Sequence, residues 1–290
     1  MIDLHMHSTF SDGSLTPEQL VAKGREIGLT AMALTDHDCT SGVPRFLAAC
    51  AAAGIAGVAG VEISAEVPRG TLHMLGYFIQ PGHPFLEEVL HRIRDGREIR
   101  NAEILRKLNA LGMELTWEEV AKHAGEDVVG RPHFAMALIA RGYVAGKQDA
   151  FDRFLAKNKA AYVDRFRLSP EDSIAAIAKG GGVPILAHPF TLGLGRKDLK
   201  KTVGQLKDAG LQGIEVFYSE HSPEQTRLYM NLAKEFDLAA TGGADFHGAA
   251  NPVVKMGIGF GSLEVADDVI AELRARRDGA RRRQQATGSA

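Results

Sequence analysis

The sequence of 290 residues contains only two cysteines, Cys39 and Cys50, and neither belongs to a CxxC pair or to a nucleophile motif. We therefore expect both thiols to be reduced, as is usual in the cytoplasm. No stretch approaches the roughly 20 consecutive apolar residues that a membrane span needs. The sequence thus predicts neither a disulfide-rich secreted protein nor a membrane protein.

The chain also lacks a strong charge of either sign, because 34 Lys and Arg face 36 Asp and Glu, for a net charge of −2. A protein that holds a long nucleic acid needs a basic face, so we expect no duplex DNA partner. A small phosphorylated substrate, or short RNA, remains compatible with this balance. With 45% hydrophobic residues, the chain can bury the core of one large domain or of a domain with an insert. Nothing in the composition indicates an oligomeric state.

Imidazoles and carboxylates, in contrast, gather in three short stretches at residues 3–8, 35–38 and 243–247. Side chains alternate along an extended strand, so His5 and His7 should face the same side and hold one ion together. The same argument applies to Asp245 and His247. The clusters follow or end short apolar runs, which places them at the C-terminal rim of barrel strands, where such folds carry their chemistry.

A single Asp or His near a strand end is more often a cap or a solvated loop residue, so the prediction of a polynuclear metal site depends on repetition. Six of the eleven histidines adjoin strand-like runs. Glu62 ends a further apolar run, where a buried carboxylate needs a partner that a cation would provide. The six histidines are His5, His7, His37, His73, His188 and His247.

The order of strand-like and helix-like segments along the chain predicts a barrel interrupted by a helical insert. Residues 1–80 alternate as βα units, with strands at 31–35, 56–62 and 71–79. Residues 81–167 read as consecutive helices, and the barrel resumes over 168–278 with strands near 183–187, 213–217 and 238–241. We expect helices at 17–28, 43–53, 84–111, 116–124, 132–141, 148–157, 170–179 and 263–277, and a disordered polar tail at 279–290.

These motifs, in this order, resemble the PHP (polymerase and histidinol phosphatase) metallohydrolases. The resemblance implies an α/β fold, a distorted (β/α)7-type barrel with a helical insertion or cap. Within the family, Val129-Gly130-Arg131-Pro132-His133 and Ala161-Tyr162-Val163 are most similar to the stand-alone 3',5'-nucleoside bisphosphate phosphatases, which are also linked to 5'-to-3' trimming of short RNA. The segments that carry the family resemblance are His5–His7, Thr35–Asp38, Gly60–Ser64, His73–Tyr77, Ala187–Pro189 and Ala244–His247.

The resemblance also implies three divalent ions and assigns their ligands. It places the first ion on His5, His7, Glu62 and Asp245, the second on Glu62, His73 and His188, and the third on Asp12, His37 and His247. A hydroxide bridging the ions, held through Glu62 and Asp245, would attack phosphorus. The family suggests manganese, although imidazole and carboxylate ligands also suit iron or zinc. Asp36 is expected to orient a ligand histidine by accepting its second ring proton.

Candidates for substrate contact come from the insert and from the first motif. Arg131 and His133 lie in a turn that opens a helix, where an arginine can bind phosphate through two hydrogen bonds. The alternative for Arg131 is a structural bond to a carboxylate within the insert. Ser8 and Lys159 are further candidates. Because the insert follows the strand that carries His73, we expect it to depart beside the metal rim and to cover it.

The expected activity is removal of the 3'-phosphate from a nucleoside 3',5'-bisphosphate, such as adenosine 3',5'-bisphosphate. Hydrolysis of histidinol phosphate and exonucleolytic trimming of short RNA remain alternatives. Phe190, Phe217 and Tyr218 could stack a base, although aromatics at strand ends are more often part of the core. Outside enzymes, the chain could be an inactive metal-binding accessory module, since PHP domains also occur in DNA polymerases.

Overall fold

The computed structural model describes residues 1–124 and 129–288 of the chain. It divides into two compact units, one made of Met1–Val89 and Leu168–Ala290 and the other of Leu90–Arg167. We call them the barrel unit and the insert unit, and describe each by itself.

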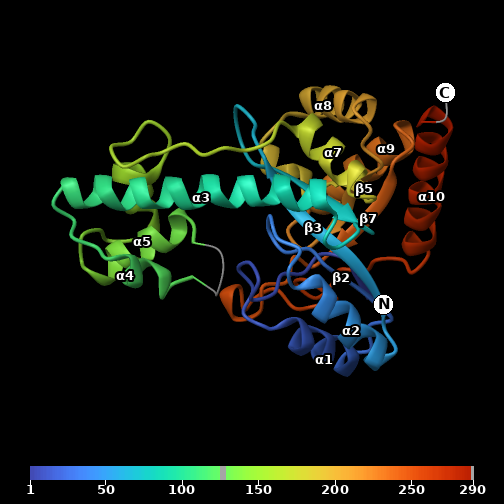
Figure 1. Ribbon diagram of the computed structural model, residues 1–290, viewed down its shortest axis with the longest axis horizontal. Helices are drawn as coiled ribbons and strands as arrows, with labels where there is room; N and C mark the ends of the chain where they lie inside the picture. Colours follow the sequence, from blue (N-terminus) through green and yellow to red (C-terminus); the bar gives the residue numbers. More distant parts are fainter. Residues whose placement is uncertain (125–128, 289–290) are drawn as a thin grey trace. The chain divides into compact units, whose positions relative to one another are not determined.

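The barrel unit is built on a seven-stranded sheet whose strands lie side by side in chain order. Just after the first strand the sheet nearly closes on itself, because the Leu4 and His7 amides donate to the carbonyls of Gly242 and Phe246. A barrel-shaped α/β fold was thus correctly predicted (Figure 1). The strands are β1 (Ile2–Asp3), β2 (Ala31–Leu34), β3 (Ala56–Ala65), β4 (Leu72–Tyr77), β5 (Val183–Leu186), β6 (Gly213–Tyr218) and β7 (Ala239–Gly243).

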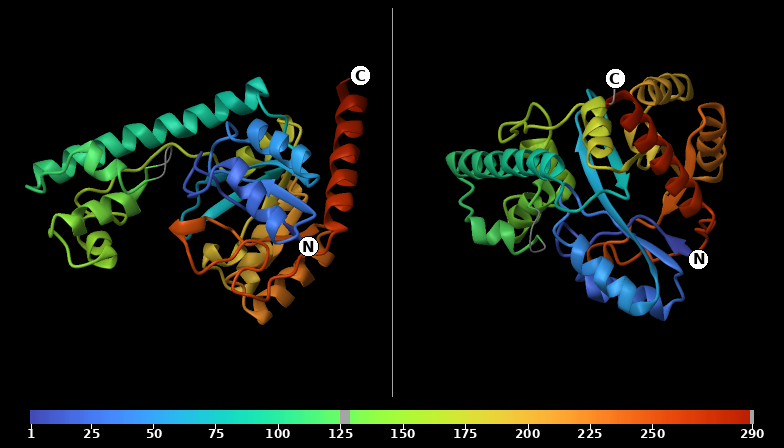
Figure 2. Two further views of the ribbon diagram at one scale, coloured as in Figure 1. Left: turned by 90° about the horizontal axis from the view of Figure 1, so that it is seen from below. Right: turned by 45° about the vertical axis from the view of Figure 1, so that its right-hand side comes forward.

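Helices surround these strands (Figure 2). The first is opened by Thr16, whose hydroxyl accepts a hydrogen bond from the Gln19 amide while the Gln19 side chain accepts one from the Thr16 amide. This reciprocal cap satisfies amides that the first helical turn leaves without partners. The barrel helices are α1 (Pro17–Glu26), α2 (Val43–Ala53), α7 (Pro170–Lys179), α8 (Arg196–Asp208), α9 (Pro223–Glu235) and α10 (Val269–Gly288), with short 3-10 turns at Pro189–Leu192 and Gly248–Ala250.

Strand β4 distorts the barrel, because it runs antiparallel to both β3 and β5. Ser64 pairs with His73 near the rim, whereas Gly60 pairs with Tyr77, where β4 ends. The insert therefore leaves the barrel from the end opposite the rim, and the expectation that it departs beside the metal ligands is wrong. It is the returning chain that reaches the rim, where Leu168 forms a bridge to Ala65.

The insert unit is helical, as predicted. Its longest helix, α3, spans Pro84–Ala110, and its first turns belong to the barrel unit. There Leu86 is fully buried and the Lys179 ammonium lies 4.6 Å from the Phe85 ring centre. The remaining elements are α4 (Trp117–Ala121), α5 (Arg131–Ala140), α6 (Lys147–Ala150) and a π-helical turn at Phe151–Leu155. Their apolar side chains, such as Phe134 and Leu138 of α5, form one core with Ile104 and Leu108 of α3.

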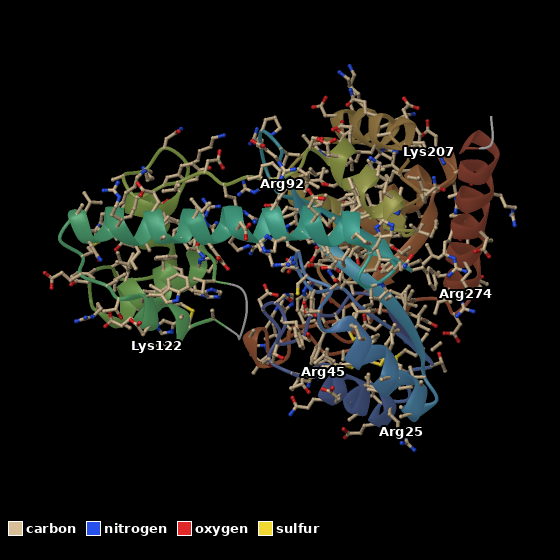
Figure 3. The ribbon with its side chains drawn as sticks, in the orientation of Figure 1. Arg25, Arg45, Arg92, Lys122, Lys207 and Arg274 are labelled. Carbon is tan, nitrogen blue, oxygen red and sulfur yellow. The ribbon has the colours of Figure 1, made fainter. Side chains whose placement is uncertain are left out.

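The C-terminal helix differs from its prediction at both ends. It begins at Val269 rather than 263, and it continues to Gly288, so the residues expected to form a disordered tail from 279 are helical as far as the structure describes them. Positions 289–290 lie outside the described residues. Val269 and Leu273 pack on the barrel core, which anchors the start of this helix. Polar side chains such as Arg25 and Lys207 lie on the outer faces of helices (Figure 3). Within the described chain, no helix combines the length and apolar character needed to cross a bilayer.

Candidate metal centre

All nine predicted ligands meet at one end of the barrel. They form four overlapping groups, within each of which the ligand atoms lie within 4.8 Å of one another. Most follow strand ends as expected, but β3 continues past Glu62 to Ala65 and His73 stands near the start of β4. Because β4 is antiparallel, its start lies at the same rim as the ends of its neighbours. The groups are His7, Asp12, His37 and His247; His5, His7 and Asp245; His5, Glu62 and His188; and His37, Glu62 and His73.

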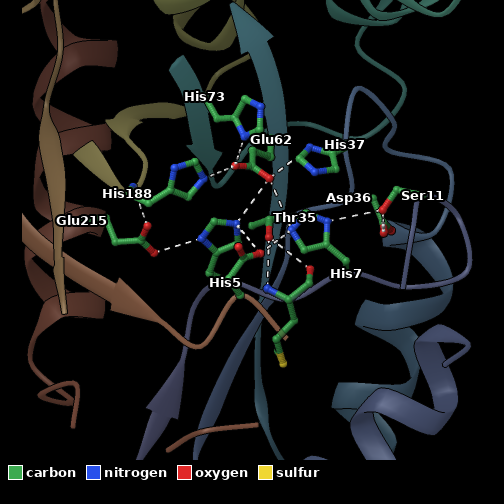
Figure 4. A network of polar contacts seen from close by, with 12 residues as sticks. His5, His7, Ser11, Thr35, Asp36, His37, Glu62, His73, His188 and Glu215 are labelled. Atoms are coloured by element: carbon green, nitrogen blue, oxygen red, sulfur yellow. Dashed lines mark hydrogen bonds and ion pairs between the residues drawn. The ribbon is translucent and has the colours of Figure 1, made fainter. Parts of the chain in front are cut away.

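Glu62 stands at the middle of this assembly (Figure 4). Its Oε1 lies 2.9 Å from both His73 Nδ1 and His188 Nε2. Its Oε2 lies 3.3 Å from His7 Nε2 and 3.1 Å from His37 Nδ1. A carboxylate whose two oxygens face different imidazoles can bridge two cations.

Asp245 and Asp12 complete the assembly on either side of His7. Asp245 Oδ1 lies 3.3 Å from His5 Nε2 and 3.1 Å from His7 Nε2. Asp12 Oδ1 lies 3.2 Å from His247 Nε2, and its Oδ2 lies 3.7 Å from His37 Nε2. His5 and His7 thus face one place, as alternation along an extended chain predicts.

Several of these ligand atoms are buried without a hydrogen bond. A buried polar atom with no partner costs about 1–3 kcal/mol, so a cluster of them at one point calls for a ligand. Imidazole nitrogens and carboxylate oxygens together are donors to divalent cations. The residues therefore fit metal ions. The atoms, among the described residues, are His5 Nε2, His7 Nε2, His37 Nδ1, Glu62 Oε2 and Asp245 Oδ1.

The electrostatics of the assembly set its proton balance. Burial lowers the pKa of His7, but Asp245 and Glu62 outweigh it and raise that pKa to about 10. Burial raises the pKa of Asp245, yet His5, His7 and His247 hold it well below its usual range. Burial, helped by His7 and His73, lowers the pKa of His37 to about 4. A cation must therefore displace protons from some of its imidazoles, but not from His37.

Glu215, which no motif pointed out, positions two of the ligands. It lies on β6, and both of its oxygens accept hydrogen bonds: Oε1 lies 2.9 Å from His5 Nδ1 and Oε2 accepts the His188 amide at 2.8 Å (Figure 4). A carboxylate behind a ligand histidine fixes the ring and directs its other nitrogen to the metal. The signal in the sequence was slight, a single charged residue within the apolar run of β6.

Two ligands have backbone conformations that sequence reasoning did not foresee. His188 has φ of +22° and Asp245 has φ of +57°, the left-handed region that non-glycine residues seldom adopt. Asp245 and His247 therefore face the site through a turn, and not through strand alternation as predicted. The Tyr218 hydroxyl donates to Asp245 Oδ2 at 2.8 Å and holds this carboxylate in place.

The predictions for Asp36 and Ser8 were wrong in detail. Asp36 accepts hydrogen bonds from the amide and hydroxyl of Ser8 and from the Ser11 hydroxyl, each at 2.7 Å, and not from a histidine ring. It acts on His7 indirectly, because Ser11 Oγ lies 3.4 Å from His7 Nδ1. Ser8 is fully buried with its hydroxyl donated to Asp36, so it is not placed to contact a substrate.

The remaining candidates lie in the insert unit. Arg131 donates to the Leu155 carbonyl at 3.2 Å and packs beside the rings of Phe151 and Tyr162, so its structural bond is to a carbonyl and not to a carboxylate. His133 Nδ1 accepts a hydrogen bond from the Gly130 amide at 2.9 Å, and Lys159 is exposed.

Arg131 is one of five arginines that gather in this unit. Burial and the nearby Arg165, Arg97, Arg131 and Arg167 lower the pKa of Arg100 to about 8. Arg100 is 5% exposed and donates to Asn101. Arg167 forms an ion pair with Asp164 at 3.1 Å. Guanidinium groups are the side chains that bind phosphate through paired hydrogen bonds.

The PHP domain model matches residues 3–175, more than half of the chain. The protein belongs to the PHP family. It is 35% identical to a 3',5'-nucleoside bisphosphate phosphatase of Chromobacterium violaceum, over 85% of this chain and 87% of the relative. It is 34% identical to the 5'-3' exoribonuclease Rnm of Salmonella typhimurium, over 84% of each chain.

The fold is shared with a protein of Bifidobacterium adolescentis described as a metal-dependent phosphoesterase, with a TM-score of 0.79, 31% identity and coverage of 95% of this chain and 96% of that one. Together with the ligand assembly, these relatives make the protein a metal-dependent PHP phosphoesterase, a hydrolase of phosphoester bonds.

Proposed function

We propose that this PHP phosphoesterase removes the 3'-phosphate of nucleoside 3',5'-bisphosphates with the help of three divalent ions. The observation that carries the proposal is the convergence of five buried ligand atoms, from Glu62, Asp245 and three histidines, that make no hydrogen bond within the described part of the chain. A phosphate dianion binds readily to a site where several cations concentrate positive charge. Manganese is our first choice of metal, and iron or zinc would suit the same donors.

We assign the ions as the resemblance to the family implies. His5, His7, Glu62 and Asp245 would hold the first, and Glu62, His73 and His188 the second. The distances from Glu62 to these imidazoles are compatible with both sets. Asp12, His37 and His247 would hold the third. Four residues, His5, His7, His37 and Glu62, each belong to two of the observed groups, so neighbouring ions would share ligands.

The bound ions would supply an activated water and neutralise charge on the phosphate oxygens. The chain's own residues prepare this chemistry by position. Tyr218 holds the carboxylate of Asp245, and Glu215 holds the ring of His5. The hydroxyls of Ser8 and Ser11 donate to Asp36 and are not free to attack, which favours direct hydrolysis by water over a phosphoenzyme.

The identity of the substrate is inferred from the relative in Chromobacterium violaceum and from the insert. A nucleoside bisphosphate carries a second phosphate that is not cleaved. We propose that Arg131 binds it, assisted by the neighbouring arginines and by His133 and Lys159. The planar guanidinium group suits bidentate binding of phosphate.

Short RNA is the second candidate, favoured by the exoribonuclease of Salmonella typhimurium and by the same arginines. Several arginines in one place can bind more than one phosphate of a short strand. The near-neutral net charge speaks against long polymers.

The test supplies the purified protein with Mn²⁺, Fe²⁺ or Zn²⁺ and offers adenosine 3',5'-bisphosphate, histidinol phosphate and 5'-phosphorylated oligoribonucleotides. We expect inorganic phosphate and adenosine 5'-monophosphate as the fastest products. Faster release of mononucleotides from RNA would favour the second candidate, and faster hydrolysis of histidinol phosphate would refute both. In oxygen-18 water, a single turnover should place the label in phosphate. Label in the alcohol product would contradict attack at phosphorus.

A further inference from the structure

A cavity of about 570 Å³ adjoins the metal centre within the barrel unit. Its lining includes Tyr218, whose hydroxyl donates to the metal ligand Asp245 and whose ring centre lies 5.3 Å from that of His188. The cavity thus begins at a residue that already contacts the metal centre. A molecule with one end at the metal ions could extend past Tyr218 into it.

The lining is aromatic and carries little charge. Phe217, Tyr218, His221 and Phe260 contribute rings, and Ser219, Thr226 and Ser262 contribute hydroxyls. Glu264 is its one acidic residue, and among the described residues no lysine or arginine lines it. A second phosphate would therefore find no counter-charge here, whereas a neutral heteroaromatic ring would find stacking surfaces and hydrogen-bonding groups.

Phe260 is the most unusual part of this lining, because it is 56% exposed in a loop that fixes its backbone. Gly257, Gly259 and Gly261 all have positive φ, at +78°, +56° and +111°, so the loop turns on both sides of Phe260. The amide of Gly259 donates to Lys255 O at 2.8 Å, and a Cβ at Gly259 would come within 2.6 Å of Ser219 Oγ. The chain thus holds a large apolar ring at the surface through a backbone conformation that favours glycine.

His221 contributes a neutral ring to the lining. Its Nδ1 lies 2.9 Å from the Val216 carbonyl and so carries the ring proton, while its Nε2 is buried with no partner among the described residues. Burial lowers the pKa of His221, in keeping with a neutral ring. The ring therefore adds aromatic surface, and no positive charge, to the lining.

We propose that this cavity binds the nucleobase of the substrate, with Phe260 stacking on the base and Tyr218 separating it from the metal ions. This rests on the proposed function, because it names the part of a nucleotide that the barrel unit recognises. Stacking on an aromatic side chain tolerates different bases, so we expect broad acceptance of bases but a strong requirement for one.

The kinetic test compares adenosine 3',5'-bisphosphate with an abasic sugar 3,5-bisphosphate that lacks only the base. Phe260→Ala should lower kcat/KM for the nucleotide by roughly 5- to 150-fold, mainly through KM, and should leave the abasic analogue unchanged. Phe260→Trp should restore most of the loss. Val253→Ala is the matched control, since Val253 is 64% exposed nearby but does not line the cavity. Equal losses on both substrates, or none, would overturn the assignment.

A binding test separates this inference from the proposed function. Calorimetry of chelator-treated protein with adenosine 5'-monophosphate and with ribose 5-phosphate needs neither metal nor turnover. Wild type should bind the nucleotide more tightly, and Phe260→Ala should abolish that preference. If nucleoside bisphosphates are not hydrolysed but this preference is found, the proposed function fails and the base site stands. If they are hydrolysed and no preference is found, the base site fails alone.

Discussion

Glu62 is the residue whose loss should disturb the metal centre most widely, because its two oxygens face five imidazoles. Glu62→Gln replaces one of these oxygens by an amide nitrogen, which cannot bind a cation. We expect metal content to fall by more than one ion per chain and turnover to be lost. Elemental analysis and a phosphate-release assay measure both. Glu66→Gln, at an exposed position just after the same strand, is the control. Full metal content in Glu62→Gln would refute the bridging role.

Glu215 allows a sharper test, because both of its oxygens accept hydrogen bonds from metal-ligand residues. Glutamine has a single acceptor oxygen, so Glu215→Gln must lose the bond to His5 or the bond to His188. Loss of such supporting bonds typically costs about 10- to 100-fold in metal affinity. Metal titration monitored by calorimetry checks this, with the exposed Glu220→Gln as control. Unchanged affinity, accompanied by a lower melting temperature alone, would make Glu215 a purely structural residue.

The difference between Glu62 and Glu215 shows what the sequence could reveal about single residues. Glu62 ends a recognisable apolar run within a motif, and the structure brings all nine predicted ligand residues together. Glu215 belongs to Gly213–Tyr218, where alternation gives no reason to expect a carboxylate bonded to His5, which is 210 residues away. The prediction for Ser8 failed for the opposite reason. Its position beside His7 in the sequence suggested contact with a substrate, but its hydroxyl donates a hydrogen bond to Asp36.

At the scale of elements, helix and strand positions were largely predicted but strand direction was not. An alternating strand pattern is the same in either direction, and only pairing decides it. The segment 71–79 therefore gave no sign that β4 runs antiparallel to its neighbours. The consequence is large, because the end of β4 determines where the insert leaves the barrel.

Helix α5 begins at Arg131, the residue that we propose to bind phosphate. If Arg131 binds the phosphate that is not cleaved, Arg131→Ala should lower kcat/KM for adenosine 3',5'-bisphosphate. The loss of transition-state stabilisation should be about 1.5–3 kcal/mol, the scale of a charge-assisted hydrogen bond. Arg131→Lys should also lose activity, because an ammonium cannot form the planar fork.

Two controls separate substrate binding by Arg131 from support of the insert. A monoester without a second phosphate should be hydrolysed at nearly the wild-type rate by both variants. Arg141→Ala, which removes an exposed ion pair with Glu119 at the other end of α5, should leave both substrates unaffected. Equal losses on both substrates would instead indicate that the packing of Arg131 on Phe151 and Tyr162 stabilises the fold.

At the scale of the whole molecule, the buried charges make metal loading and folding depend on pH together. Burial opposes the charge on His7, but its neighbouring carboxylates raise its pKa from 6.5 to about 10 in the folded, metal-free protein. Protonated His7 therefore stabilises the folded state at pH values below 6.5, the pKa of histidine in the unfolded chain. This stabilisation is lost as the pH rises towards 10. The metal-free protein should therefore lose stability as the pH rises above about 6.5.

The metal-loaded protein should not share this loss, because each imidazole must release its proton before it binds a cation and then has no proton left to lose. Apparent metal affinity should rise with pH, by up to about tenfold per pH unit for each proton displaced. A metal ion that binds only the folded state stabilises it by RT ln(1 + [L]/Kd), so a tighter Kd means more stabilisation. The difference in melting temperature between metal-loaded and chelator-treated protein should therefore widen from pH 6.5 to 8.5. Calorimetric melts at fixed metal concentration measure this gap. His91→Ala, which alters an exposed histidine far along the sequence from any ligand, should leave the gap unchanged. A gap that stays constant or narrows as the pH rises would mean that the imidazoles of this centre are already unprotonated before metal enters, contrary to the charges that surround His7.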